Sequence, residues 1–402
     1  MIGVAVLGST GSVGESTLDV LARHPGRFRL VAIAANTNAA KLARQVLQYR
    51  PAYAALADPG AAAELKGLLG GAAAGTRVLA GAGALEELAV MPEAQCVMAA
   101  IVGSAGLRST LAAACAGKRL LLANKESLVM AGPLLVAAVN ASGAVLLPID
   151  SEHNAIFQCL PPGAKTGVVP PGVRRVLLTA SGGPFRDTPS EALAGVTPQA
   201  AIAHPNWVMG RKISVDCATL MNKGLELIEA CLLFGLTPAQ VQILVHPQSI
   251  VHSLVEYVDG SVLGQLSAPD MRTPIAHALA WPDRIDSGVE FLDLLKTGRL
   301  EFRAPDTDKF RCLALAQAAA RAGGLQPVVL NAANEIAVEA FLEGRLNFPG
   351  IAAVIEAVVE RSTGGAIGEL EDVLAADAES RVRARERIVG LTRGASVRGA
   401  RA

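Results

Sequence analysis

Short apolar runs alternate with helical patterns along residues 1 to about 150. The apolar runs are VAVL (4–7), RLVAIAA (29–35), CVMAAIV (96–102), RLLLA (119–123) and AVLLPI (144–149). One helical pattern runs from Glu15 to Arg23 and stops at Pro25, and another starts at Ala39. Strands that are apolar on both faces and alternate with helices indicate a Rossmann-like, doubly wound parallel sheet.

From residue 151 onward the pattern changes to a mixture of sheet and helix. The sequence predicts a strand at VRRVLLTAS (173–181), one long helix over residues 215–234 and a strand at VQILVHP (241–247). SIVHSLVEY and SVLGQLS, joined by Asp259 and Gly260, predict a β-hairpin. These elements indicate an α+β domain.

A linker and a helical region follow. Residues 282–310 are rich in Asp, Pro and Gly, and the Ala-rich remainder predicts helices with polar faces. A chain of 402 residues is long enough for several hydrophobic cores. The expected α/β protein therefore has a nucleotide-binding domain (1–150), a catalytic domain (151–281), a linker (282–310) and a C-terminal α-helical domain (311–393).

Charge and cysteine content narrow the choice of partner and compartment. The 36 basic residues equal the 36 acidic ones, so no overall field attracts nucleic acid or an anionic membrane. Six cysteines without a C-x-x-C pair indicate free thiols in a reducing cytoplasm. The N-terminal MIGVAVLGSTG lacks the basic segment and cleavage site of an export signal. We therefore expect a cytoplasmic protein whose anionic ligands are bound by local groups.

Two segments suggest other partners. Residues 128–149 carry no charge and have the length of a membrane span, but Gly132, Pro133 and the NASG run (140–143) predict a helix, a turn and a strand instead. The last 22 residues contain seven arginines and one acid, as a nucleic-acid-binding arm would. Because no aromatic residue among them can stack on a base, a solvated helix end is the better interpretation.

The first predicted strand runs directly into a glycine-rich turn. VAVLGSTGSVGESTLDVL places Gly8, Gly11 and Gly14 between this strand and the first helix. Glycines at these positions let the backbone approach a pyrophosphate, whose charge then faces amides at a helix N-terminus. The alternative is a glycine-rich turn that binds nothing.

The end of the second predicted strand indicates which dinucleotide binds. An NAD site usually places a carboxylate there, whereas this strand ends on Asn36, Thr37 and Asn38. Without that carboxylate, a 2′-phosphate is not repelled, so NADPH is favoured over NADH. Lys41 is the nearest basic residue.

Acidic and basic residues gather where the later strands of this sheet end. Lys125 and Glu126 follow one strand and are expected near the nicotinamide, since ligands gather at the carboxyl ends of such strands. Asp150 and Glu152 follow the last one, two residues apart, which places both carboxylates on one side of an extended segment. A divalent cation such as Mg²⁺ or Mn²⁺ would relieve their repulsion.

The helical pattern of the second region adds a third carboxylate. In MNKGLELIEA, Asn222 and Glu226 are four residues apart and share a helix face with Lys223. The alternative is an ordinary surface helix with a Lys223–Glu226 pair.

A Gly/Pro-rich stretch supplies further polar groups. TASGGPF places Ser181 beside a flexible turn, and HPNWVMGRKIS adds His204 and Trp207 in a segment that can close as a lid over about residues 181–211. The alternatives are a packing role for Trp207 and a surface histidine. The other histidines have no metal-ligand spacing on one helix.

Together these motifs resemble the 1-deoxy-D-xylulose 5-phosphate reductoisomerase family. The motifs GSTGSVG, AANTN, ANKESLV, PIDSEHNAIFQ, SGGPF, HPNWVMGRKISVD, MNKGLE, HPQSIVHS, PDMRTPIAHALAWP and LNAANEIAV occur in the family order from about residue 3 to 390. The resemblance implies three domains, a homodimer, and NADPH-dependent conversion of 1-deoxy-D-xylulose 5-phosphate to 2-C-methyl-D-erythritol 4-phosphate with a divalent cation, in isoprenoid synthesis.

The resemblance also implies roles for single residues. The implied metal ligands are Asp150, Glu152 and Glu226, and the implied catalytic residues are these three with Lys125 and His204. The implied substrate contacts are Lys125, Ser151, Glu152, Ser181, His204, Trp207, Cys217, Asn222, Lys223 and Glu226. The implied cofactor contacts are Thr10, Gly11, Ser12, Val13, Asn36, Thr37, Asn38, Asn124, Glu126 and Gly210.

The chain departs from the family pattern at two of these positions. Cys217 replaces a serine of the phosphate pocket, and a thiol donates a weaker hydrogen bond than a hydroxyl. We therefore expect weaker phosphate binding, which Cys217→Ser would reverse by lowering KM. Thr37 stands where relatives often carry a basic residue, so we expect weaker selectivity for NADPH than in those relatives.

Two rival functions share parts of this pattern. A simple dehydrogenase of the semialdehyde or homoserine kind has the same N-terminal domain but often needs no divalent metal, and Asp150, Glu152 and Glu226 argue against it. A non-catalytic NADPH-sensing protein is the second rival, since fold alone does not establish function. The complete set of acids, lysines and histidine argues against that alternative.

Overall fold

Residue contacts divide the chain into two compact units. The computed structural model describes residues 1–72, 75–203 and 209–399. Unit 1 comprises residues 1–127, 135–158 and 270–292, and unit 2 comprises the remaining segments, 128–134, 159–269 and 293–402. The three domains expected from the sequence stay a prediction.

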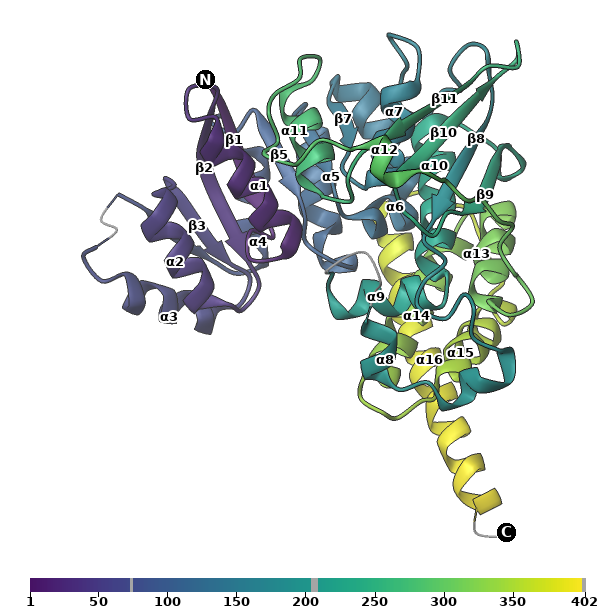
Figure 1. The fold of residues 1–402 in the computed structure, drawn as a ribbon. Helices are drawn as coiled ribbons and strands as arrows, with labels where there is room; N and C mark the ends of the chain where they lie inside the picture. Colours follow the sequence, from purple (N-terminus) through teal and green to yellow (C-terminus); the bar gives the residue numbers. More distant parts are fainter. Residues whose placement is uncertain (73–74, 204–208, 400–402) are drawn as a thin grey trace. The chain divides into compact units, whose positions relative to one another are not determined.

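Unit 1 is built on a parallel sheet of seven strands, in the order β4-β3-β2-β1-β5-β6-β7 (Figure 1). The strands are β1 (Ile2–Leu7), β2 (Phe28–Ala35), β3 (Tyr53–Leu56), β4 (Arg77–Ala80), β5 (Cys96–Ala99), β6 (Arg119–Leu122) and β7 (Val145–Pro148). Their order reverses between β1 and β5, which is where ligands of such sheets bind. The predicted doubly wound sheet is confirmed.

Helices connect the successive strands from β1 to β6, and they are α1 (Ser12–Arg23), α2 (Ala39–Tyr49), α3 (Pro59–Leu69), α4 (Ala82–Val90) and α5 (Leu107–Cys115). Two further helices of unit 1, α7 (Ser151–Cys159) and α11 (Arg272–Ala280), follow the last strand of the sheet. Side chains start two of them: Asn38 caps α2, and Asp58 caps α3 ahead of Pro59. Helix α1 begins three residues earlier than its apolar pattern predicted, so Ser12 and Val13 belong to its first turn.

The uncharged segment over residues 128–149 is bent, as its Gly and Pro residues predicted. Helix α6 (Lys125–Ser142) has non-helical backbone angles at Ala131, two residues before Pro133, and ends at Gly143 in the left-handed conformation. Strand β7 then begins at Val145. None of the helices in the described parts of the chain is long and apolar enough to span a membrane.

Unit 2 contains a mixed sheet of four strands, in the order β11-β10-β8-β9. The strands are β8 (Val173–Ala180), β9 (Val241–Val245), β10 (Val251–Tyr257) and β11 (Val262–Leu266). β10 and β11 form the predicted antiparallel hairpin, whereas β8 and β9 are parallel. The turn of the hairpin contains Asp259, whose carboxylate accepts a hydrogen bond from the Ser261 amide at 2.9 Å.

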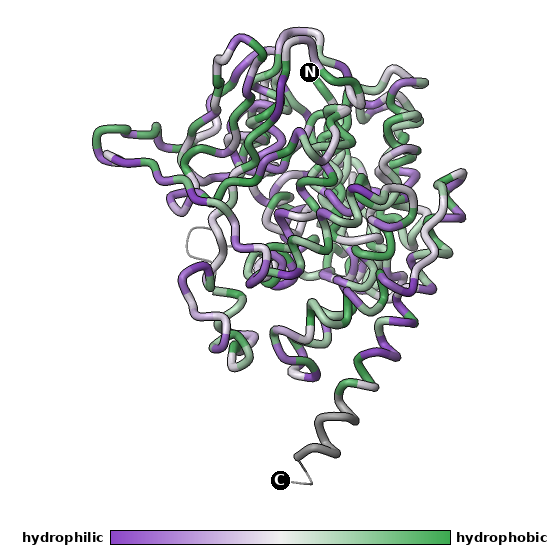
Figure 2. The backbone as a smooth tube through the Cα atoms, turned by 90° about the vertical axis from the view of Figure 1, so that its right-hand side faces the viewer, coloured by the Kyte–Doolittle hydropathy of each residue, from purple (hydrophilic) through white to green (hydrophobic). Residues whose placement is uncertain are grey.

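Helices form the rest of unit 2 (Figure 1). They are α8 (Pro198–Ile202), α9 (Arg211–Ala218), α10 (Met221–Phe234), α12 (Leu294–Thr297), α13 (Arg311–Ala322), α14 (Gln326–Leu342), α15 (Phe348–Glu360) and α16 (Leu370–Gly399). The prediction of one helix over residues 215–234 is wrong, because Leu220 adopts a left-handed conformation (φ 58°) between α9 and α10. Along α16, polar and apolar residues alternate up to residue 391 (Figure 2).

Candidate active site

The glycine-rich turn of unit 1 allows close backbone approach. Gly8 directly follows β1 with φ 92°, and a Cβ there would lie 2.4 Å from the Ala100 carbonyl oxygen. A Cβ on Gly14 would lie 2.3 Å from the Gly8 carbonyl oxygen. Gly11 precedes α1 and contributes no side-chain cap to it. The first amides of α1 therefore meet the requirements for binding a pyrophosphate.

The end of β2 is fixed against this turn by α2. The Ser9 hydroxyl donates to Gln45 Oε1 at 2.7 Å, and Gln45 Nε2 donates back to the Ser9 carbonyl oxygen at 2.9 Å. Asn38 accepts the Lys41 amide at 3.0 Å, and the Lys41 ammonium pairs with Glu15 of α1 at 2.7 Å. Asn36, Thr37 and Asn38 therefore link β2 to α2 next to this turn, with Asn38 as the N-cap residue of α2.

Asn124 braces the start of α6. Its Oδ1 accepts the Ser127 amide at 2.8 Å, and its Nδ2 donates to the carbonyl oxygens of Ile101 and of Gly103, the latter at 3.0 Å. These bonds join the carboxyl ends of β5 and β6 on one side of the switch between β1 and β5. Asn124 thus has a structural role, whatever it contributes to binding a cofactor. Glu126 follows in the first turn of α6 and is buried.

Lys125, Asp150 and Glu152 gather at the carboxyl ends of β6 and β7. The Lys125 ammonium forms an ion pair with the Asp150 carboxylate. One ligand oxygen of Asp150 and one of Glu152 lie within 4.8 Å of each other. The Ser151 hydroxyl donates to Glu152. Paired carboxylates at this spacing offer hard oxygen ligands to a divalent cation.

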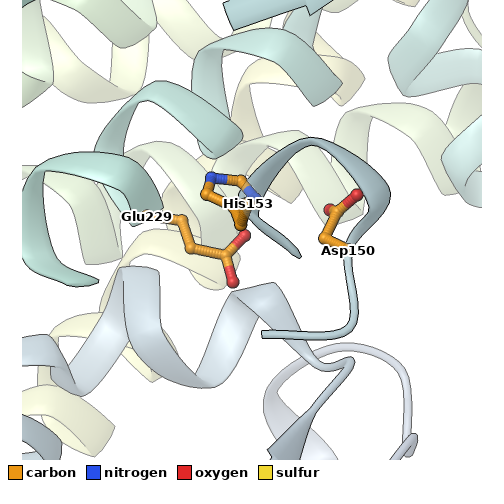
Figure 3. A group of neighbouring side chains, drawn as sticks. All are labelled: Asp150, His153 and Glu229. Atoms are coloured by element: carbon orange, nitrogen blue, oxygen red, sulfur yellow. The ribbon is translucent and has the colours of Figure 1, made fainter. Parts of the chain in front are cut away.

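The backbone of this acidic pair differs from the prediction. β7 ends at Pro148, and Glu152 lies in the first turn of α7, so the two carboxylates do not share one side of an extended segment. They approach each other because the chain turns into a helix between them. Figure 3 shows Asp150 on the loop before α7 and His153 within the helix.

Asn154 holds this turn and was missed by the sequence analysis. Its Nδ2 donates to the Pro148 carbonyl oxygen at 2.9 Å and lies 3.2 Å from Nδ1 of His277 on α11. The residue is buried at 1% exposure. The sequence did offer a signal: Asn154 is a polar residue that follows a buried strand and stands before apolar residues. A side-chain amide buried there needs hydrogen-bond partners, so a structural role could have been predicted.

Helix α10 of unit 2 carries a second polar group. Asn222 Nδ2 donates to Glu226 Oε1 at 2.6 Å, and the Lys223 ammonium pairs with the other carboxylate oxygen. Lys223 is 3% exposed and Glu226 1% exposed, so the alternative of an ordinary surface helix is wrong. Glu229, which is labelled in Figure 3 and lies one turn further along α10, is also buried. Burial of a charged pair on this scale is typical of functional sites rather than of stabilising surface pairs.

The loop after β8 runs against the end of α9. Gly183 has φ 69°, and a Cβ there would lie 2.6 Å from the Cys217 carbonyl oxygen. The Gly183 amide donates to the Ser181 hydroxyl oxygen at 3.2 Å. Within unit 2 the Ser181 loop and Cys217 are therefore neighbours. Two of the residues expected around a phosphate thus come together from segments far apart in the sequence.

A buried aspartate fixes α9. Asp216 accepts from Asn334 Nδ2 of α14 at 2.8 Å and pairs with Lys212 at 2.9 Å. This contact was missed, since nothing local marks Asp216 as buried. Gly210 is the exposed N-cap residue of α9. His204 and Trp207 lie outside the described residues.

Comparison with known proteins identifies the family. The model for 1-deoxy-D-xylulose 5-phosphate reductoisomerase matches residues 4–132, that for its C-terminal domain matches residues 146–234, and that for the DXP reductoisomerase C-terminal domain matches residues 266–383. The reductoisomerase of Pseudomonas fluorescens is 59% identical over 383 residues, and that of Methylococcus capsulatus is 60% identical over 382 residues. Each alignment covers 95% of this chain and 97% of the relative.

Solved structures agree with this assignment. A DOX-P reductoisomerase in complex with NADPH, fosmidomycin and magnesium has a TM-score of 0.94 at 47% identity, covering 97% of this chain and 99% of that one. The Zymomonas mobilis enzyme in complex with NADPH has a TM-score of 0.89 at 48% identity, covering 96% and 99%. The chain therefore belongs to the 1-deoxy-D-xylulose 5-phosphate reductoisomerase family, as its motifs predicted.

Proposed function

We propose that this chain converts 1-deoxy-D-xylulose 5-phosphate to 2-C-methyl-D-erythritol 4-phosphate, using NADPH and a divalent cation, in isoprenoid precursor synthesis. One observation carries the proposal: the Lys125, Asp150 and Glu152 cluster lies at the carboxyl edge of the same sheet whose first strand ends in the glycine-rich turn. That edge therefore offers groups that can bind a reducing cofactor and groups that can bind a cation.

The residues that bind the cation are proposed from the chemistry of their side chains. Asp150, Glu152 and Glu226 offer hard oxygens, which suit Mg²⁺ or Mn²⁺ and leave positions for two substrate oxygens. When bound, the cation polarises those oxygens during rearrangement, and NADPH supplies the hydride for reduction. Ser151 orients Glu152 through its hydroxyl. Lys125 holds Asp150 in place and presents an ammonium donor to the substrate.

The phosphate of the substrate is proposed to bind to unit 2. Lys223 supplies positive charge, and Ser181, Asn222 and Cys217 supply weaker donors. Binding energy from this remote group can drive closure of the proposed lid over residues 181–211, which includes His204 and Trp207, and so exclude water. The NADPH contacts are proposed to be the ten residues given in the sequence analysis. We also propose a homodimer in the cytoplasm.

The test follows absorbance of NADPH during incubation with 1-deoxy-D-xylulose 5-phosphate. We expect turnover with Mg²⁺, none with excess chelator, and a loss of at least about a hundredfold in kcat/KM for Glu226→Gln. Exposed Glu339 of α14 provides the control, because Glu339→Gln removes the same charge from unit 2 and should change kcat/KM less than twofold.

A binding measurement separates metal loss from misfolding. Calorimetric titration with Mn²⁺ should show weaker binding by Glu226→Gln, while its affinity for NADPH stays unchanged because the nucleotide turn is in unit 1. Metal-independent turnover by the parent would contradict the proposal. Binding of NADPH with no turnover at all would favour the sensing protein.

A further inference from the structure

The end of β2 does not itself supply the charge that an NADPH 2′-phosphate requires. Asn36, Thr37 and Asn38 carry neither a carboxylate to repel that phosphate nor a cation to attract it. The Asn38 side-chain oxygen already accepts the Lys41 amide at 3.0 Å. A positive group from a neighbouring element would therefore add to the preference for NADPH that the missing carboxylate allows.

Lys41 is placed to provide it. It lies in the first turn of α2, directly after the end of β2, and it is the one basic residue between positions 36 and 43. Its side chain is 25% exposed, so its ammonium is neither buried away from a ligand nor fully solvated. The buried pair of Ser9 and Gln45 fixes this helix against the glycine-rich turn, which keeps Lys41 at a constant position relative to a dinucleotide.

In the structure the Lys41 ammonium is already paired with a carboxylate. Lys41 pairs at 2.7 Å with Glu15, whose side chain is 52% exposed, in the first turns of α1. Exposed ion pairs contribute little free energy, so a phosphate with two charges can replace or share the carboxylate at small cost. Glu15 thus orients Lys41 in the absence of nucleotide and competes with the phosphate in its presence.

We propose that Lys41 is the residue that discriminates NADPH from NADH in this chain, with Glu15 as its exchangeable counter-ion. The inference rests on the proposed function, since it assumes that the dinucleotide binds at this turn. It adds a specificity-determining residue that lies beyond Asn36, Thr37 and Asn38.

Nucleotide affinity tests the inference without catalysis. Calorimetric titration with NADPH and with NADH should give a Kd for NADPH about tenfold higher in Lys41→Gln than in the parent, and a Kd for NADH changed less than about twofold. Glu15→Gln should bind NADPH about two- to threefold more tightly and leave NADH nearly unchanged. The loss of NADPH affinity in Lys41→Gln should be smaller at high salt, because salt screens the attraction between ammonium and phosphate.

Arg44 provides the matched control. It is exposed on the same helix, three residues further from the N-terminus of α2, so Arg44→Gln removes the same charge from the same surface. We expect the Kd of this variant for NADPH and for NADH to change less than twofold. An equal loss in Arg44→Gln, or an equal loss of NADPH and NADH affinity in Lys41→Gln, would overturn the inference.

The outcomes also separate this inference from the proposed function. A parent protein that binds neither nucleotide overturns the proposed function itself. A parent that reduces the sugar phosphate with NADPH, while Lys41→Gln keeps the parental ratio of the two dissociation constants, overturns only the role of Lys41. Thermal unfolding of each variant should be close to that of the parent, since the Lys41–Glu15 pair is partly exposed and contributes little to stability.

Discussion

The Lys125 ammonium forms an ion pair with the Asp150 carboxylate, across the carboxyl ends of the neighbouring strands β6 and β7. Both side chains are shielded, at 6% and 16% exposure. Lys125 thereby partly neutralises one member of an acidic pair. A divalent cation binding to Asp150 must compete with this ammonium, which links metal binding to the freedom of Lys125 to contact the substrate.

Removing Lys125 should separate metal binding from turnover. In Lys125→Gln the cation no longer competes with an ammonium, so we expect equal or tighter Mn²⁺ binding by calorimetry. Turnover should fall by about a hundredfold or more, because a positioned proton donor is lost. Lys296→Gln is the control, since that side chain is 87% exposed. Weaker Mn²⁺ binding by Lys125→Gln would show that the ammonium supports the ligands instead.

Replacing the thiol of Cys217 should strengthen phosphate binding. Cys217 lies against the Ser181 loop, and a hydroxyl donates a stronger hydrogen bond to phosphate than a thiol does. We expect Cys217→Ser to lower KM for the sugar phosphate about two- to fivefold with little change in kcat. Exposed Cys115 supplies the control variant, Cys115→Ser. An unchanged or higher KM in steady-state assays contradicts the expectation.

His277 should make the protein less stable in mild acid. Burial, with a smaller effect of Arg284, lowers the pKa of His277 to about 4, whereas an unfolded histidine has a pKa near 6.5. The folded state thus binds fewer protons than the unfolded state between these values. The stability that His277 contributes is present above about pH 6.5 and is lost as pH falls toward 4, by about 3 kcal/mol at most.

The difference between two unfolding curves measures this effect. Urea unfolding of the parent and of His277→Gln should be compared from pH 7 to pH 4, so that the titration of carboxyl groups common to both cancels. We expect the parent to lose more stability than the variant over that interval. Parallel pH dependences would show that His277 is protonated in the folded state.

Helix packing in unit 2 should not tolerate a methyl group at Gly224. A Cβ there would lie 2.3 Å from the Cβ of Ala316, where α10 packs on α13. Because the helices must separate, we expect Gly224→Ala to cost about 1–3 kcal/mol of unfolding free energy. Gly390 of α16 has nothing within 4 Å of such a Cβ, so Gly390→Ala should stabilise by up to about 1 kcal/mol. Equal midpoints of urea unfolding for Gly224→Ala and the parent would contradict the packing argument.

Local patterns determined much of the fold. Apolar runs with glycine between them predicted the parallel sheet, and the Asp259–Gly260 turn predicted the hairpin of β10 and β11, because both features depend on residues close in sequence. The family motifs alone indicated the expected chemistry, because they carry its acidic and basic residues. The positions of Lys125 and Asp150 at the ends of neighbouring strands follow from the same parallel topology.

Other features were decided only by tertiary structure. Leu220 takes up a left-handed conformation that no apolar period encodes, so one predicted helix became α9 and α10. Asp150 and Glu152 come together through the turn into α7 rather than along a strand, and Asn154 fixes that turn through partners such as His277, which is 123 residues away in the chain. The burial of Lys223 and Glu226 likewise depends on what packs over α10. A sequence determines which side chains are available and which local conformations they favour, whereas burial and long-range partners are set by the packing of distant segments.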